Sequence, residues 1–375
     1  MFDTIEQKPD KKLLLAILAL TLFGWIMSSS ASVGHFGTFS FAFKQGVFIL
    51  LGIVTGVVIL RLPLSFFKRH SLLAFGITLF LLFLVFLPDI GAGKINGAYR
   101  WIDLGIFNFQ PSEMMKMVMI LFMANFLVEQ EEYITKSLKG LFKAIFIISL
   151  SGALTIAETD LGATIIITAT ALIMVFIAGS YVKELFYIGT IILFGLSIFV
   201  YFNPARWGRV ISFWTNDLWG KDGVYQTKQA LLGIARGDWF GTGLGSGIQK
   251  YTKLPEPHTD MIFAITGEEL GIVGMLFILL SFAYILTKGF KIAAKASKDG
   301  RKYSYYVAYG ICSWFAMQIS VNIAMNIGLM PIKGFTLPLI SYGGSSMIFT
   351  ITALALLLRI DMENRAGYSK RKSYV

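Results

Sequence analysis

The sequence predicts an all-α integral membrane protein with about ten transmembrane helices and a large extracytoplasmic loop between the seventh and eighth spans. Three observations lead to this fold class. The 375 residues are 55% hydrophobic and only 15% charged, whereas a soluble domain carries about 25% charged residues. Long apolar runs recur along the whole chain, and the charged residues gather in the short segments between them.

Each apolar run is long enough, or nearly so, to cross a hydrocarbon core of about 30 Å as a helix. A backbone inside lipid has to satisfy its own hydrogen bonds, which favours helices. Only Glu158-Thr159-Asp160 separates the fifth run from the sixth. The expected spans are residues 12–30, 45–61, 71–88, 111–129, 141–157, 162–179, 184–202, 262–287, 304–329 and 336–358.

The positive charges predict the orientation. Lysine and arginine concentrate in alternate short segments, and by the positive-inside rule these segments and both termini are cytoplasmic. We therefore expect one polytopic domain over 1–375, an outer loop over 203–259 and a basic cytoplasmic tail over 360–375. The basic segments are 8–12, 61–69, 136–143, 288–302 and 359–372.

Several classes of protein are excluded. The formal net charge of +11 follows the loops of a polytopic protein, so we expect no nucleic acid partner. The single cysteine, Cys312, lies in an apolar run, which excludes a disulfide framework and a thiolate metal cluster. The first run has the length of a span and lacks an A-x-A site, so it is expected to be retained. The glycine-rich segment 241–245 has neither a preceding strand nor the Gly-Lys-Ser/Thr ending of a nucleotide-binding loop.

An aspartate stands where the long outer loop meets the eighth run. Two prolines and His258 precede Asp260, and Met261 opens the apolar stretch. Desolvation at the end of a hydrophobic bundle raises the pKa of a carboxylate, which suits a general base. The alternative is structural, since Thr259 or Asp260 could cap the helix that follows.

Other polar residues gather on the expected outer side, and each has a structural alternative. Glu113 and Lys116 are three residues apart and could pair along a helix. Trp101 could anchor the chain at the membrane interface, and the segment 343–346 could serve close helix packing. Lys333 stands on the side where lysine is sparse, and a fixed cation there suits an anionic group such as a diphosphate.

The order of these motifs resembles the SEDS family (shape, elongation, division and sporulation) over nearly the whole chain. Within it, residues 337–341 resemble the cell-division branch, FtsW, more than the elongation branch, RodA. The motifs are Arg100-Trp101-Ile102-Asp103-Leu104-Gly105, Gln110-Pro111-Ser112-Glu113, Asp160-Leu161-Gly162, Gly241-x-Gly243-Leu244-Gly245, Leu254-Pro255-Glu256-x-His258-Thr259-Asp260, Gly267-Glu268-Glu269-Leu270-Gly271, Asn326-Ile327-Gly328, Pro331-x-Lys333-Gly334 and Ser341-Tyr342-Gly343-Gly344-Ser345-Ser346.

The resemblance implies a peptidoglycan glycosyltransferase of the bacterial cytoplasmic (inner) membrane that polymerises lipid II at the outer face, in septal wall synthesis. It implies a class B penicillin-binding protein, a transpeptidase, as partner, with other divisome or elongasome membrane proteins around it. The family's essential aspartate corresponds to Asp260, and its tryptophan, arginine and lysine correspond to Trp101, Arg100 and Lys333. Glu158-Thr159 replaces the family's usual Gln-Pro, which puts the shape of that loop in doubt.

As a mechanism we expect Asp260 to act as the base in an inverting transfer, with cations stabilising the departing diphosphate. Whether a divalent cation, Mg²⁺ or Mn²⁺, is held by Asp260 or Glu256 stays open at this stage. A lipid II flippase, an elongation-type polymerase and a non-catalytic scaffold are the alternatives. The expected substrate-binding residues are Arg100, Trp101, Arg209, Lys250, Glu256, His258, Lys333 and Ser345.

Overall fold

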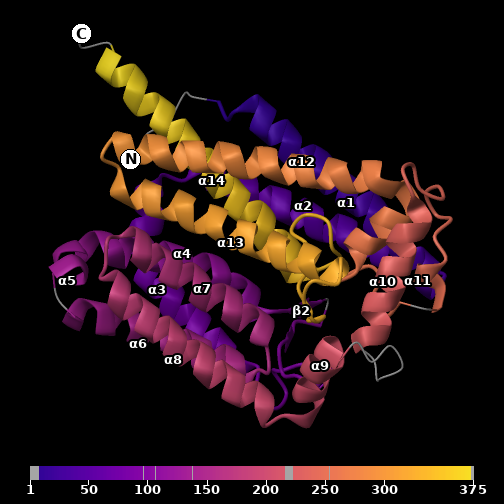
Figure 1. Cartoon of the computed structure of the whole chain (residues 1–375). Coiled ribbons are helices and arrows are strands. Elements are labelled where there is room, and N and C mark those ends of the chain that lie inside the picture. The colour runs from indigo at the N-terminus through magenta and orange to yellow at the C-terminus, as the bar shows by residue number, and fades with distance from the viewer. Residues whose placement is uncertain are drawn as a thin grey trace.

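The computed structural model describes residues 8–95, 97–105, 107–136, 138–215, 223–252 and 254–372. Most of the described chain forms long helices that run side by side between two ends of the molecule (Figure 1). The long helices are α1 (Lys11–Phe36), α2 (Ser40–Arg61), α3 (Leu64–Leu84), α4 (Pro111–Glu129), α6 (Leu138–Ala157), α7 (Leu161–Ile177), α8 (Val182–Tyr201), α12 (Ile262–Lys298), α13 (Lys302–Asn326) and α14 (Gly344–Lys372). The short elements are β1 (Ile102–Asp103), β2 (Asn108–Phe109), α5 (Glu131–Lys136), α9 (Pro204–Thr215), α10 (Gly223–Gly237) and α11 (Gln249–Thr252).

The predicted class, an all-α membrane protein, is confirmed. Within the described ranges, nine helices are long and apolar enough to cross a membrane. The apolar helix α7 has 17 residues and is shorter than the others, because Asp160 caps its start and a left-handed Gly179 follows its end. The prediction of about ten spans counted this short helix as one of them.

The predicted boundaries of the last two spans were wrong. Helix α13 ends at Asn326 instead of 329, and α14 begins at Gly344 instead of 336. Pro331 and Pro338 lack the N–H that a helix needs, and Leu339 has a left-handed φ of 64°. The chain therefore crosses from α13 to α14 in a loop of irregular structure, and this loop is one wall of the site described below.

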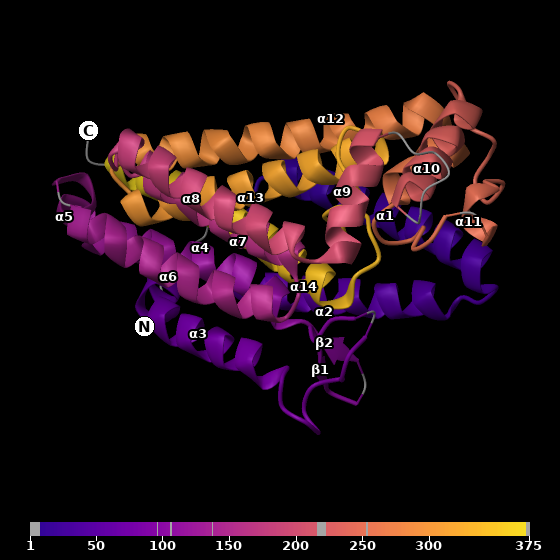
Figure 2. The same ribbon diagram turned by 60° about the horizontal axis from the view of Figure 1, so that its bottom comes forward.

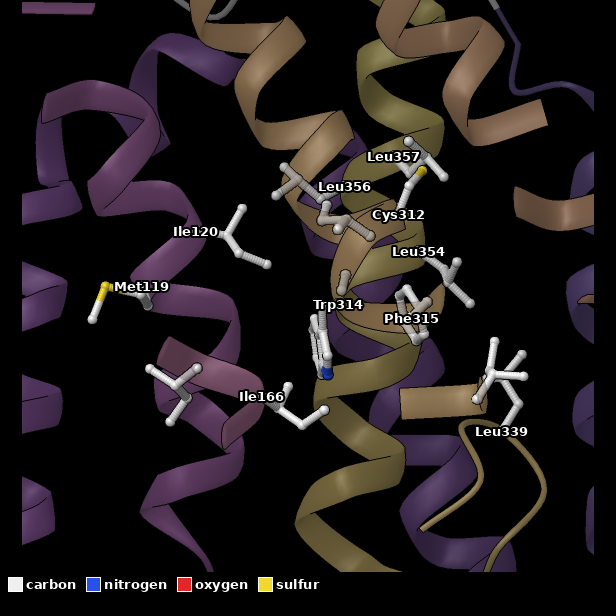
Figure 3. Close-up of a cluster of buried hydrophobic side chains, with 14 of the residues drawn as sticks. Met119, Ile120, Ile166, Cys312, Trp314, Phe315, Leu339, Leu354, Leu356 and Leu357 are labelled. Atoms are coloured by element: carbon white, nitrogen blue, oxygen red, sulfur yellow. The ribbon is translucent and has the colours of Figure 1, made fainter. Parts of the chain in front are cut away.

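The core of the bundle lies where α4, α7, α13 and α14 meet. Figure 3 shows buried side chains of this core around Trp314, with Ile120 from α4 and Ile166 from α7 on one side of its ring. Helix α14 also packs along α2, α12 along α13, and α3 along α4. In contrast, α8 buries none of its residues, so it lies at the periphery of the bundle.

The two ends of the bundle differ in kind. The start of α1, the end of α14 and helix α5 lie at one end, and β1, β2 and α9–α11 lie at the other (Figures 1 and 2). At the first end Arg365 donates a 2.8 Å hydrogen bond to the Lys8 carbonyl, and Lys288 lies 3.2 Å from the Asp10 carboxylate. The predicted basic tail is helical as far as Lys372.

The predicted outer loop over 203–259 contains helices α9, α10 and α11, and it is tied to α12 by two adjacent glutamates. Glu268 accepts hydrogen bonds from the backbone N–H of Ile248 (2.8 Å) and Gln249 (3.1 Å). Glu269 lies 2.5 Å from the Lys250 ammonium. Glu268 thus binds the loop through the loop backbone and Glu269 through an ion pair. Their carboxylates fix the loop against the bundle just before it reaches Asp260.

Candidate active site

A cavity of about 1120 Å³ lies at the end of the bundle that carries the β hairpin. Its walls come from α2, the hairpin segment, α4, α7, the residues before α12 and the loop between α13 and α14. Cavities that hold drug-sized ligands measure about 300–1,000 Å³, so this one can admit a sugar head group. The elements that form it are far apart in the sequence.

Asp260 lines this cavity and is partly buried. Burial raises the pKa of its carboxyl to about 7, with a further upward contribution from the charge of Glu256 and an opposing one from Arg100. The capping alternative is not observed, because the N-cap of α12 is Met261, whose own side chain makes no capping hydrogen bond. A carboxyl that titrates near neutral pH inside a cavity is suited to general base catalysis.

Arg100 supplies a cation to the same cavity. Its Nη2 donates a 2.8 Å hydrogen bond to the Thr159 carbonyl, and its Nε lies 3.9 Å from Asp160 Oδ2. The side chain keeps 28% of its surface exposed, so the guanidinium is held without being sealed away. The Asp260 carboxyl and the Arg100 guanidinium therefore line the same cavity.

Asp160 joins three walls of the cavity. Its Oδ1 accepts from the Ala163 N–H at 3.1 Å and so caps α7. Its Oδ2 accepts from Gln110 Nε2 at 3.1 Å and from Ser112 Oγ at 3.3 Å, at the start of α4. The Gln110 N–H donates in turn to Ser345 Oγ at 2.9 Å, at the start of α14. These bonds fix the relative positions of the α4, α7 and α14 termini.

The predicted pairing of Glu113 with Lys116 is confirmed, at 2.7 Å, and both residues lie in the cavity wall. Lys116 Nζ also donates to Gln318 Oε1 at 3.3 Å and lies 5.2 Å from the centre of the Trp314 ring. Both charged side chains are almost fully buried. From the sequence we interpreted this pair as structural. Its place in the cavity wall follows only from the fold.

The expected binding residues divide into two sets. Arg100, Trp101, Glu256 and Ser345 line the cavity, whereas Lys250, His258 and Lys333 do not. Lys250 is buried beside Glu269. The His258 ring is buried against the rings of Phe41 and Tyr342, with centroids 5.2 and 5.4 Å away. Lys333 is partly buried and precedes Gly334, which lines the cavity. The side chain of Arg209 lies outside the described residues.

Some polar residues line the cavity without a binding role having been predicted for them. Lys44 is the residue among them that the sequence could most easily have indicated as a binding residue, because it is a single lysine near the start of an apolar run. Gln318 lies within the polar-rich ninth run, and only the packing of α13 turns it toward the cavity. These residues include Lys44, Gln110, Glu113, Lys116, Asp160, Gln318 and Tyr342.

The β hairpin was not predicted. Ile102 pairs with Phe109 and Asp103 with Asn108, and Asp103 Oδ1 accepts from the Gly105 N–H at 2.8 Å in the turn. Two-residue strands carry too little alternation to be recognised in a sequence. The hairpin holds Arg100 and Trp101, which immediately precede it, at the cavity wall.

The fold and this site define a class: a multi-pass membrane protein with a polar reaction cavity at one end of a helical bundle. Within that class, the chain belongs to the FtsW/RodA/SpoVE family, whose model, described as "Cell cycle protein", matches residues 11–366. A "Probable peptidoglycan glycosyltransferase FtsW" of Polynucleobacter necessarius is 38% identical over 371 residues, 95% of this chain and 86% of that protein. The protein of the same name from Legionella pneumophila is 37% identical over 363 residues, 95% of this chain and 91% of that one.

Two solved structures share the fold. The rod shape determining protein RodA of Thermus thermophilus superposes with a TM-score of 0.72 at 24% identity, covering 95% of this chain and 97% of that one. A chain from a peptidoglycan synthase complex, described for its coordination of polymerization and crosslinking, superposes with a TM-score of 0.78 at 23% identity, covering 95% and 98%. At these identities the likeness concerns the fold.

Proposed function

We propose that this protein is a peptidoglycan glycosyltransferase that polymerises lipid II into glycan strands, in septal wall synthesis during cell division. The names of its relatives support the reaction class, and identities of 36–38% to several FtsW proteins support the division branch. The observation that carries the proposal is the cavity itself, where the Asp260 carboxyl, with its raised pKa, and the Arg100 guanidinium face the same space.

In the proposed reaction, Asp260 takes the proton from a sugar hydroxyl of the acceptor. The freed oxygen attacks the anomeric carbon of the donor, and the bond from that carbon to the diphosphate breaks. The diphosphate leaves with the bonding electron pair, and the configuration inverts. A positioned base typically contributes about 10²–10⁴-fold to the rate.

The departing diphosphate needs positive charge or hydrogen-bond donors. Arg100 and Lys44 line the cavity and are the nearest candidates, and Lys116 is already paired with Glu113. Lys333, next to the cavity-lining Gly334, remains a candidate for the same role. Lys250 is a weaker candidate, because its ammonium is buried beside Glu269.

A divalent cation would fit this cavity only if the protein and the substrate diphosphate coordinated it together. Among the described residues no three His, Cys, Asp or Glu side chains group to hold a metal ion. Asp260 and Glu256 both line the cavity, and Mg²⁺ is often held by one or two carboxylates together with substrate phosphates. These two carboxylates would hold it, and it would supply further positive charge to the diphosphate.

We place the cavity at the outer face of the cytoplasmic membrane, with both termini in the cytoplasm. The concentration of lysine and arginine at the end that carries both termini supports this orientation. We expect a class B penicillin-binding protein as partner, which the shared fold with a chain of a peptidoglycan synthase complex supports.

The test is to incubate the purified protein in detergent with labelled lipid II, alone and with its penicillin-binding protein. We expect long glycan strands, in at least one of the two mixtures. A flippase needs a bilayer to act across, so polymer formed in detergent separates the two functions. Absence of polymer from both mixtures, with monodisperse protein, would overturn the proposal.

A further inference from the structure

Three consecutive backbone carbonyls that end at Asp260 are each bound by a donor from another part of the chain. The His258 carbonyl accepts from the Tyr342 N–H at 2.8 Å. The Thr259 carbonyl accepts from Ser341 Oγ at 2.6 Å. The Asp260 carbonyl accepts from two side chains near the end of α13, Asn326 at 2.9 Å and Asn322 at 3.1 Å. The backbone before α12 is therefore held by donors from α13 and from the segment before α14.

Asn326 does two things at once. Its Nδ2 donates to the Asp260 carbonyl, and its Oδ1 accepts from the Ala264 N–H at 3.1 Å, in the first turn of α12. Helix α12 has no side-chain cap of its own, so Asn326 supplies the cap from a different helix. An amide side chain offers a donor and an acceptor on separate atoms, so it can make both bonds at once.

Asn322 joins the Asp260 segment to the loop before α14, which also lines the cavity. Its Nδ2 also donates to the Phe335 carbonyl at 2.5 Å. The neighbouring Gly334 faces the carboxylate of Asp260, because a Cβ built there would lie 3.4 Å from Oδ2. One amide therefore fixes the backbone of Asp260 relative to the loop that the carboxylate faces.

Neither asparagine is in a position to contact a substrate in this cavity. Both are fully buried, and neither lines the cavity. A role in the reaction therefore passes through the segments that the two asparagines hold, which are Asp260 and the loop at Phe335. Displacing a catalytic group by about 1 Å can cost about 10²-fold in rate, so the hydrogen bonds that set its position matter.

We propose that Asn322 and Asn326 are positioning residues that hold the Asp260 carboxylate toward the reacting sugar, Asn326 by capping α12 from α13 and Asn322 by bridging to the loop before α14. The inference rests on the proposed function of Asp260 as the base.

The activity test compares Asn322→Leu and Asn326→Asp with wild type in the purified protein. Asn326→Asp is close in shape and keeps the acceptor for Ala264, but it loses the donor to the Asp260 carbonyl and to the Asn322 carbonyl. We expect kcat for lipid II polymerisation to fall about 10–100-fold, with KM changed less than about threefold, because substrate contacts are untouched. Ser313→Ala, a buried change on the same helix away from the cavity, is the matched control and should keep wild-type kcat.

A second readout does not depend on activity. The only native cysteine, Cys312, is buried, so Asp260→Cys places a single accessible thiol at the site. The rate at which a thiosulfonate reagent modifies that thiol reports its exposure and ionisation. We expect a change of about threefold or more when Asn322→Leu or Asn326→Asp is added, and none with Ser313→Ala.

The outcomes are distinguishable. Wild-type kcat and an unchanged thiol reaction rate in both asparagine variants would overturn the inference. A lower kcat together with a lower unfolding temperature, at an unchanged thiol reaction rate, would also overturn it. That combination is the behaviour of a purely structural residue. If Asp260→Asn keeps wild-type activity, the proposed base is wrong, while the thiol reaction still reports whether the asparagines position residue 260.

Discussion

At the scale of single residues, burial and the charges around Asp260 set the pH at which it can act as a base. Burial raises its pKa most, the charge of Glu256 raises it further, and Arg100 lowers it. A base works in its deprotonated form, so kcat should fall as the pH drops below about 7, the pKa of Asp260. The sequence already singles out Asp260, because an aspartate directly before an apolar run stands out against its neighbours, and the structure places it in the cavity wall.

The two neighbours make opposite predictions for the pH profile. Glu256→Gln removes a negative charge, so the pKa of Asp260 should fall and the acidic limb of kcat should move to lower pH. Arg100→Gln removes the positive charge, so the limb should move to higher pH. Profiles of kcat over pH 5–9 check this, and shifts of both variants in the same direction would contradict it.

Glu158 provides a stability prediction. It is fully buried, and neither of its carboxyl oxygens has a hydrogen-bond partner within the described structure. Burial, and then the charge of Asp160, raise its pKa to about 9. A raised folded-state pKa means that this carboxyl stabilises the fold below its ordinary pKa of 4.5 and loses that contribution as the pH rises toward 9.

Glu158→Gln cannot ionise, so it should escape this loss. We expect the unfolding temperature of the variant to exceed that of wild type by an amount that grows between pH 5 and pH 9. Thermal unfolding of both proteins in the same detergent measures the difference between their unfolding temperatures. The contributions of other titrating groups are the same in both proteins and cancel in this difference. A gap that stays constant across this range would show that Glu158 is ionised in the folded protein.

At the scale of elements, the sequence predicted the long helices and missed what joins them. Apolar runs define spans by length alone, so the class of fold followed from composition. The hairpin at 102–109 was missed because its two-residue strands carry too little alternation. The irregular loop over 327–343 was missed because its geometry is set by contacts between distant segments. The Glu113–Lys116 pair shows the same limit: its spacing predicted the ion pair, but only the packing of α4 against α7 and α13 brings it to the cavity.

Helix α12 contains a break that only glycine permits. Gly271 has φ 64° and ψ −160°, and a Cβ there would lie 2.5 Å from the Trp239 carbonyl oxygen and from the Gly241 nitrogen. Gly271→Ala should therefore lower stability by more than about 1 kcal/mol and loosen the outer loop. Gly76→Ala is the matched control, since nothing lies within 4 Å of its added Cβ, and that helical site should gain about 0.5–1 kcal/mol.

The measurement is thermal unfolding together with limited proteolysis of the loop between α10 and α11. Gly271→Ala should unfold earlier than wild type and be cut faster in this loop. Equal stability and equal cutting of the two alanine variants would show that the break in α12 does not hold the loop.

At the scale of the whole molecule, the distribution of charge predicts which end faces the cytoplasm. Leu244, in the loop at the cavity end, and Lys298, at the far end of α12, are both exposed. A cysteine at 244 should react with a membrane-impermeant maleimide in intact spheroplasts, and one at 298 only after lysis. The reverse pattern would place the cavity in the cytoplasm and exclude polymerisation at the outer face.

The central claim is that Asp260 takes the proton from the acceptor sugar, and the rate of lipid II polymerisation by Asp260→Asn tests it most directly. The variant keeps the shape of the side chain and the bonds to its backbone carbonyl, and it loses the basic oxygen. We predict a fall in kcat of about 10²–10⁴-fold with little change in KM. Polymerisation by Asp260→Asn at the wild-type rate would contradict the account.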